Sequence, residues 1–179
     1  PLPEDADLSV LHAAHAIDVT GGMLDANPDL SILPEATRSF PGQPGLILRD
    51  GNGTPLLPKF CFEAAQQGDD ALELVYEDTE SLLTYTATFT TNRHTRVITA
   101  KAVLDAAHSV HLHWFAAPVL PASQQSDEMI DFAGRWCGEF QLNKTRWSAG
   151  MRYRENRTGR TGHEHFPGLI LPERGATNT

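Results

Sequence analysis

The sequence predicts an all-β protein built from antiparallel strands, with few helices. Polar and apolar residues alternate with a period of two through the middle of the chain, most clearly at Leu83–Thr90. Turn residues recur roughly every 8 to 12 positions, which is the strand spacing of β-sandwiches and barrels. No stretch approaches the roughly 20 consecutive apolar residues that a membrane-spanning helix needs. We therefore expect a single domain over residues 1–179 that does not enter a membrane.

The first strands are expected in two hairpins. Leu46–Arg49 runs into Asp50–Gly53, whose Asp-Gly and Asn-Gly pairs tolerate the positive φ of tight turns, before the apolar pair at 56–57. The stretch 72–77 alternates and precedes Leu83–Thr90, with a hairpin turn expected at 78–81. In the second of these strands four apolar side chains should share one face and four threonines the other.

Further strands are expected in the second half of the chain. Pro118 and Pro121 should end the pairing of the strands that precede them. Only residues 8–17 leave a helix as an alternative to a strand. The expected strands cover residues 96–103, 110–115, 129–132, 139–147 and 151–155, the last two being separated by a turn at 148–150.

Charge is divided unevenly along the 179 residues. Residues 1–90 carry three basic and fifteen acidic side chains, whereas residues 91–179 carry eleven and eight. The stretch from Arg135 to Arg160 contains seven Lys or Arg and two Glu. Such a basic stretch could face nucleic acid, an acidic partner or the acidic half of the chain. The net charge of −9 disfavours nucleic acid, which needs a basic footprint. We expect an interdomain or solvated face. The acidic first residues are unlike a signal peptide, so we expect a cytoplasmic protein. The absence of an initiator Met leads us to expect a piece of a longer chain.

Neither the cysteines nor the histidines form a pattern that predicts a metal or cofactor site. Cys61 and Cys137 allow one bridge at most, and we expect two buried thiols in a reducing compartment. His111 and His113 share one face of a strand, as in cupin metal sites, but no Glu follows to complete the ligands. We expect two histidines on a half-exposed sheet face.

Carboxylates and tryptophans leave two further alternatives open. Glu139, Glu155 and Glu164 could pair for glycoside hydrolysis, but each lies near arginines, so a structural network is the expected role. His163 and the His two positions later could serve in acid-base chemistry, or as surface or capping groups. The tryptophans could stack on sugars or pack in a core, which we favour; they are Trp114, Trp136 and Trp147.

Two segments near the carboxyl end carry a family resemblance. Gly134–Phe140 reads GRWCGEF, and Glu155–Leu169 reads ENRTGRTGHEHFPGL. In order and spacing they resemble the amino-terminal domain of the α-galactosidases of glycoside hydrolase family 36. The resemblance covers residues 30–172, with Gly162 standing where the family usually has Ser.

The resemblance implies a galactose-mutarotase-like supersandwich of two large antiparallel sheets placed before a catalytic barrel. The family's barrel removes terminal α-galactosyl groups with retention, using two Asp whose sequence patterns this chain lacks. It implies a non-catalytic domain whose partners are the barrel of the same chain, an α-galactoside substrate and further copies in a homo-oligomer. No residue is assigned to catalysis or sugar binding. The residues expected at the seam with the barrel are Arg135, Trp136, Glu139, Asn156, Arg157, Arg160 and His163. A free-standing carbohydrate-binding β-sandwich, with Trp114 or Trp147 as a stacking platform, remains the alternative.

Overall fold

The described part of the chain is built almost entirely from antiparallel strands. A computed structural model describes residues 31–38, 43–116, 118–120, 126–148, 152–157, 159 and 164–172. These residues form ten strands and one short 3-10 helix, which confirms the all-β prediction. The elements are η1 (Ala36–Arg38), β1 (Leu46–Asp50), β2 (Pro55–Leu56), β3 (Cys61–Gln67), β4 (Ala71–Asp78), β5 (Leu83–Asn92), β6 (Val97–Ala106), β7 (Val110–Phe115), β8 (Glu128–Ala133), β9 (Gln141–Arg146) and β10 (His165–Ile170).

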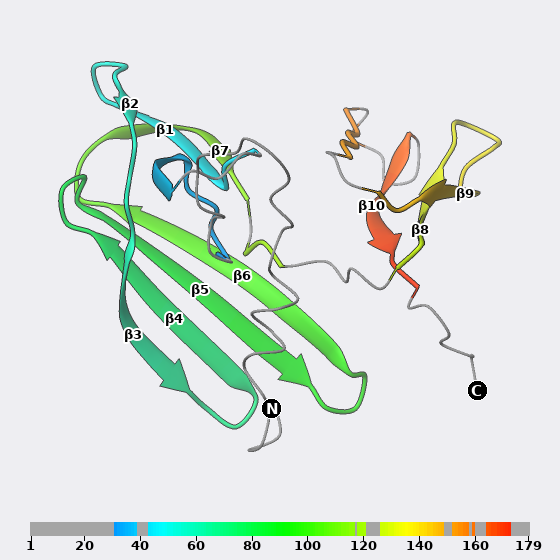
Figure 1. Ribbon diagram of the computed structural model, residues 1–179, viewed down its shortest axis with the longest axis horizontal. Coiled ribbons are helices and arrows are strands. Elements are labelled where there is room, and N and C mark those ends of the chain that lie inside the picture. The colour runs from blue at the N-terminus through cyan, green and yellow to red at the C-terminus, as the bar shows by residue number, and fades with distance from the viewer. Residues whose placement is uncertain are drawn as a thin grey trace, which may run out of the picture. The chain divides into compact units, whose positions relative to one another are not determined.

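The strands form three sheets in two compact units, residues 1–120 and 121–179 (Figure 1). The first unit holds sheet A, with the order β2-β1-β7, and sheet B, with the order β3-β4-β5-β6. The second unit holds sheet C, with the order β10-β8-β9. That residues 1–179 make up one domain stays a prediction.

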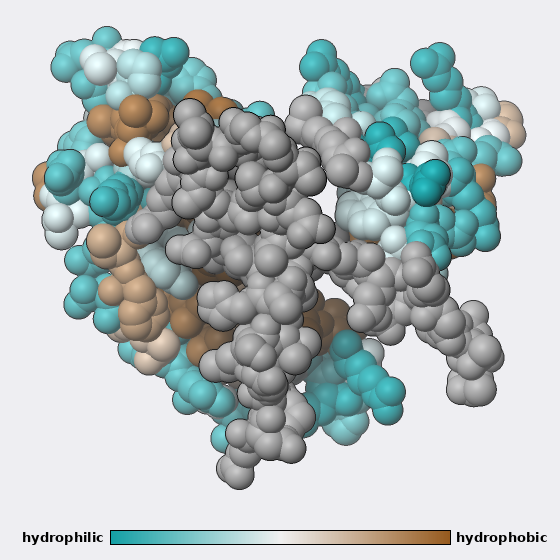
Figure 2. Space-filling view, in the orientation of Figure 1, coloured by the Kyte–Doolittle hydropathy of each residue, from teal (hydrophilic) through white to brown (hydrophobic). Residues whose placement is uncertain are grey.

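Sheets A and B share one hydrophobic core, centred on Tyr85 of β5. Alternation along β5 leaves Leu83, Tyr85 and Ala87 no more than 1% exposed, while the threonines between them are half-buried on the other face. The ring of Tyr85 lies 6.0 Å from those of Phe60, Tyr76 and Phe115, and the last of these belongs to β7 of sheet A. Figure 2 shows apolar surface over this unit, with hydrophilic atoms at its upper and lower ends.

Both predicted hairpin turns are confirmed. The Asp50 carboxylate accepts the N–H of Asn52 at 2.9 Å and of Thr54 at 2.8 Å, and Gly53 supplies a φ of +86°. The Thr54 hydrogen bond is the main cause that lowers the pKa of Asp50. In the next turn Asp78 accepts the N–H groups of residues 80 and 81 at 3.1 and 3.4 Å, which joins β4 to β5.

One expected strand is absent, two strands were not expected, and one expectation lies outside the described residues. Residues 152–155 are not a strand; Arg154 instead ion-pairs with Asp131 of β8. The edge strand β3 was not predicted because its sequence, CFEAAQQ, alternates poorly. Strand β10 was not predicted because it contains Pro167 and Gly168, and its register with β8 shifts around them. The expectation for residues 8–17 lies outside the described residues.

We predict that Tyr85→Phe does not destabilise the protein. The Tyr85 hydroxyl is buried and has no hydrogen-bond partner among the described residues, so its removal relieves a desolvated polar group at a gain of up to about 1 kcal/mol. Urea unfolding at pH 7 measures the change, with Tyr85→Ala as a control that should cost about 3 to 5 kcal/mol. A loss above about 1 kcal/mol in Tyr85→Phe would reveal a hydrogen bond and contradict the prediction.

The same variant should alter the dependence of stability on alkaline pH. Burial, together with repulsion from Tyr76, raises the pKa of Tyr85 from 10.0 to about 12. Between these values the unfolded chain has lost the phenolic proton that the folded chain still holds, so stability falls as pH rises through the window. Tyr85→Phe should make this fall shallower; the part due to Tyr76, whose pKa burial also raises, should persist.

A candidate interdomain interface

Three segments, residues 134–140, 155–157 and 164–165, meet at one end of sheet C. They carry residues predicted for an interdomain seam. The loop 134–140, here called the Gly134 loop, joins β8 to β9. The Gly134 N–H donates to the Glu164 carbonyl at 3.2 Å. The Asn156 side-chain amide donates to the carbonyl of His165, the first residue of β10, at 3.4 Å. The structure therefore brings together Arg135, Trp136, Glu139, Asn156 and Arg157.

Two of the predicted seam residues have no structural outcome. Arg160 and His163 lie outside the described residues. The role of the whole set at a seam stays a prediction.

The Gly134 loop has a tightly packed backbone. Gly134 has a φ of +144°, and a Cβ at this position would lie 2.0 Å from the Gly138 carbonyl oxygen. The Gly138 N–H donates to the Arg135 carbonyl at 2.8 Å. Cys137 and Phe140 adopt φ values of 63° and 56°, a region that costs a non-glycine residue roughly 1 to 2 kcal/mol. The strained backbone presents Trp136 with 70% of its surface exposed.

The arginines of this region have unequal partners. Arg157 Nε lies 2.6 Å from Glu155 Oε1, and this hydrogen bond is the main cause that raises the pKa of Arg157. The Arg157 side chain is 80% exposed, so in the chain as described it does not hold a buried carboxylate. Arg154 does: its Nε and Nη2 lie 2.9 and 2.8 Å from Oδ2 of Asp131, whose side chain is 6% exposed.

The Asp131–Arg154 pair was not among the predicted seam residues. The sequence did not indicate it, because alternation along a strand places Asp131 on the face opposite to Ile130 and Phe132, where a carboxylate is expected to be exposed. Asp131 Oδ1 and His165 Nδ1 are buried and have no partner among the described residues. Sheet C therefore contains incompletely satisfied polar groups close to the predicted seam.

A hollow of about 340 Å³ opens beside the Gly134 loop. It is lined by Gly134, Arg135, Glu164 and His165, and its volume could admit a sugar ring or a side chain of a neighbouring module. It combines a cation, a carboxylate and an imidazole.

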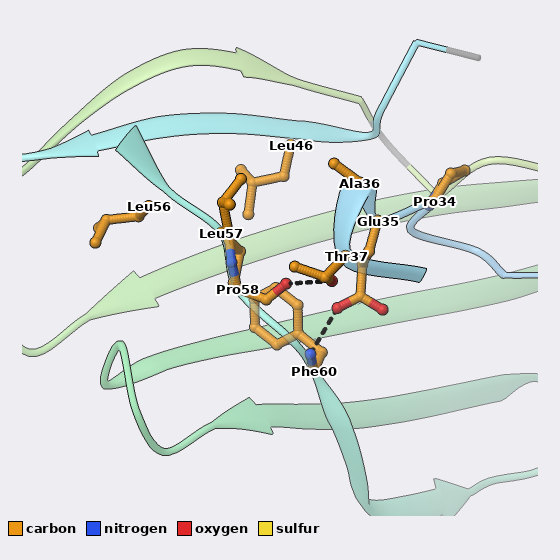
Figure 3. A pocket seen from close by; sticks show the side chains of 9 residues that line it. All are labelled: Pro34, Glu35, Ala36, Thr37, Leu46, Leu56, Leu57, Pro58 and Phe60. Atoms are coloured by element: carbon orange, nitrogen blue, oxygen red, sulfur yellow. Dashed lines mark hydrogen bonds between the residues drawn. The ribbon is translucent and has the colours of Figure 1, made fainter. Parts of the chain in front are cut away.

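A second, smaller hollow lies in the first unit around Glu35 (Figure 3). The Glu35 carboxylate accepts the Phe60 N–H at 2.6 Å, and the Thr37 hydroxyl donates to the Pro58 carbonyl at 3.0 Å. The hollow encloses about 20 Å³, which admits about one water molecule. Its polar groups tie η1 to the segment before β3, so this hollow has a structural role.

The cysteines and histidines give no metal centre in the described part of the chain. Cys61 and Cys137 are free thiols, as expected, but the expectation that they are buried is wrong: both are exposed. The first begins the edge strand β3 and the second lies in the Gly134 loop. His111 and His113 are exposed on β7, and no group of three metal-ligating side chains occurs among the described residues.

The three tryptophans differ in exposure. Trp114 is 43% exposed and pairs with Ile47 on the face of sheet A that turns away from the core, so the expectation that it is packed fails for about half of its surface. Trp147 is half-buried, and its backbone N–H donates to the Asp127 carbonyl at 2.8 Å.

No helix among the described residues has the length and apolar character to cross a membrane.

The antiparallel sheets and the loop cluster at the end of sheet C place the chain in the class of β-sandwich-like domains. The family model described as the glycosyl hydrolase family 36 N-terminal domain matches residues 7–179. The chain belongs to glycosyl hydrolase family 36, as its N-terminal domain, and this family is one of glycoside hydrolases. The resemblance seen in Gly134–Phe140 and Glu155–Leu169 is thereby confirmed.

Similar proteins agree with this assignment. An α-galactosidase of Escherichia coli is 30% identical over 163 residues, which cover 86% of this chain and 22% of the relative. The structure of the α-galactosidase AgaB of Geobacillus stearothermophilus matches with a TM-score of 0.67 at 17% identity, over 80% of this chain and 22% of AgaB. A variant of AgaA from the same organism, in complex with 1-deoxygalactonojirimycin, matches with a TM-score of 0.69 at 17% identity, over 91% and 27%. The structural matches show the fold, and the chain spans about a quarter of its relatives.

We predict that Gly134→Ala strongly destabilises the second unit. The added Cβ would overlap the Gly138 carbonyl and would force an unfavourable φ, at a cost of about 2 to 4 kcal/mol. Gly138→Ala is the matched control, because a Cβ there meets its nearest neighbour, the Arg135 carbonyl, at 3.7 Å. Urea unfolding followed by tryptophan fluorescence reports the change. Equal midpoints for the two variants would show that the Gly134 loop is not packed as described.

Proposed function

We propose that this domain is the non-catalytic N-terminal part of an α-galactosidase that hydrolyses terminal α-D-galactosyl residues with retention. The observation that carries the proposal is the family match over residues 7–179, supported by the α-galactosidase of Escherichia coli at 30% identity. About three quarters of each relative has no counterpart in this chain. The described residues form open sheets and no barrel, so we place the catalytic barrel in that remainder. Barrel enzymes take their catalytic groups from the ends of the barrel strands.

The buried carboxylates of the described residues support a non-catalytic role. Retaining glycosidases need two carboxyl groups about 5 to 5.5 Å apart that are free to act on substrate. Glu35 accepts the Phe60 N–H, Asp78 accepts backbone N–H groups in a turn, and Asp131 binds Arg154. Each buried carboxylate therefore already holds a structural partner.

The substrates that fit this proposal are galacto-oligosaccharides of the melibiose and raffinose type. One AgaA variant that matches this fold is described in complex with raffinose, and another with 1-deoxygalactonojirimycin. The whole enzyme, as we propose it, acts on galacto-oligosaccharides of this type. The N-terminal domain supports the barrel and a homo-oligomer.

The seam with the barrel is proposed to use the end of sheet C. Arginine suits this role because its planar guanidinium binds a carboxylate through two parallel hydrogen bonds, which lysine cannot do. The Gly134 loop already presents Arg135 and Trp136 outward. The proposed seam residues are Arg135, Trp136, Glu139, Asn156, Arg157, Arg160 and His163.

One observation favours a second candidate function, a free-standing carbohydrate-binding module. Trp114 is 43% exposed beside Ile47 on the outer face of sheet A, where an indole could stack on a sugar ring. The two candidates make opposite predictions for binding by the isolated chain.

We predict that the 179-residue chain releases no product from a chromogenic α-galactoside, whereas the full-length protein turns it over. The reason is that the reacting carboxylates belong to the barrel. Calorimetric titration of the chain with galactose or melibiose should give no heat of binding. Binding that disappears in Trp114→Ala would support the carbohydrate-binding module instead, and turnover by the chain alone would contradict the assignment of catalysis to the barrel.

We predict that Arg157→Lys lowers the melting temperature of the full-length protein by a few degrees and leaves that of the 179-residue chain unchanged. In the isolated chain Arg157 forms only an exposed pair with Glu155, of a kind that contributes little to stability. At a seam with the barrel, replacement by lysine would remove a bidentate contact between the guanidinium group and a carboxylate. Arg93→Lys, in an exposed pair of the first unit, is the control. Identical melting shifts in both proteins would speak against Arg157 at the seam.

A further inference from the structure

The two faces of sheet C differ in burial and in polarity. On one face Met129 and Asp131 of β8 are 2% and 4% exposed, so a carboxylate lies on the buried side. The other face is apolar and open, with Leu142 opposite Phe132 and Ile170 opposite Ile130. We call this second face the aromatic face; it consists of Ile130, Phe132, Phe140, Leu142, Phe166 and Ile170.

The aromatic face is continuous and exposed. The ring of Phe166 lies 6.4 Å from that of Phe132 and 5.7 Å from that of Phe140, so the three rings make one cluster across the strands. Phe140, Leu142 and Ile170 are 56%, 55% and 52% exposed. Apolar clusters that soluble proteins leave this open mark contact surfaces.

Charge on this face is neutralised within the sheet. Lys144 faces the same side as Leu142 and lies 3.3 Å from Glu128. The pair presents no net charge to a partner, which fits an apolar partner surface rather than a charged one.

The second unit also needs further burial for stability. Met129 is the one apolar residue below 9% exposure among the described residues of this unit. A three-stranded sheet becomes stable when at least one face buries apolar surface. Most of the exposed apolar side chains of sheet C lie on the aromatic face, whereas Leu169 lies opposite Asp131 on the other face. A cover on the aromatic face would therefore supply most of the missing core.

We propose that the aromatic face is the docking surface for the catalytic part of the same polypeptide. This inference rests on the proposed function, because it takes the proposed barrel as the occupant, and it adds the surface on which the barrel packs. The length of chain outside the structure supports it: this chain covers 22% of the Escherichia coli relative and 22% of AgaB. The face also includes Phe166 and Ile170 of β10, the last described strand, so the described part of the chain ends close to this face.

The size of the face favours a partner on the same chain over a second copy. Three strands about 4.8 Å apart and six residues long, at about 3.4 Å per residue, give an area of about 300 Å². Separate proteins that associate stably bury about 800 Å² on each partner. A partner on the same chain is held at high effective concentration and needs less contact area.

Thiol reactivity in the full-length protein tests whether the face is covered. Cys61 and Cys137 are replaced by Ser, and Leu142→Cys is compared with Leu57→Cys, a matched control in the first unit that is 67% exposed. Each native rate with a maleimide is divided by the rate of the same variant unfolded in urea. We expect the ratio for Leu142→Cys to be at least about tenfold below that for Leu57→Cys, because a thiol under a packed domain reacts only after local opening. Equal ratios would overturn the proposal.

Photo-crosslinking identifies the occupant and does not depend on the Leu142→Cys variant. The photoreactive amino acid p-benzoylphenylalanine replaces Phe140 in the full-length protein, and mass spectrometry identifies the linked peptide. A peptide from the catalytic barrel of the same polypeptide supports the proposal, and one from the chain between residue 179 and the barrel would overturn it. A peptide from residues 1–120, or a link between two copies that disappears on dilution, would overturn it.

Activity of the same variants separates this inference from the proposed function. An active α-galactosidase whose residue 142 reacts freely would refute the docking surface and leave the proposed function standing. A protected residue 142 in a full-length protein that does not hydrolyse α-galactosides would refute the proposed function, and with it the identity of the occupant.

Discussion

The packing of one ring, that of Tyr85, holds the first unit together. Its neighbours at 6.0 Å come from the segment before β3, from β4 and from β7, so the ring joins sheet B to sheet A. The side chain is 1% exposed, and its hydroxyl has no hydrogen-bond partner among the described residues. Shape and apolar area, rather than hydrogen bonding, therefore fix this position. Strand β5 places the Tyr85 ring in the core, and β7 of sheet A covers this ring.

The second unit obeys a different constraint, since its sheet buries a carboxylate and exposes its aromatic rings. Asp131 is the more buried partner of an ion pair with Arg154, and such a pair adds little net stability once desolvation is counted. It does fix which face of β8 turns inward, because an unpaired carboxylate could not be buried. The apolar face is thereby directed outward. A unit built in this way would complete its core on a neighbour, as we propose for the aromatic face.

The sequence predicted those strands whose two faces differ in polarity. The alternation of Leu83–Thr90 predicted β5 and its inward face, because period-two patterns report burial directly. Strand β10 contains Pro167 and Gly168, and only pairing with β8 makes it a strand. The seam residues were grouped by family resemblance, and the structure brings five of them to one end of sheet C. The Asp131–Arg154 pair was not predicted, because 23 residues separate the two side chains and only the fold brings them together.

Phe140 links the strained loop to the aromatic face. It ends the Gly134 loop with a φ of 56°, and its ring continues the aromatic cluster through Phe166. The backbone conformation of the Gly134 loop therefore also determines where the Phe140 ring lies. Trp136 and Arg135 stand on the same loop, so a neighbour that covers Phe140 would meet polar and amphipathic side chains at the margin of an apolar centre. Protein interfaces have this arrangement, with an apolar core and a polar rim. The proposed arginine seam and the aromatic face are then two parts of one contact, in which the rings supply the free energy and the guanidinium groups fix the orientation.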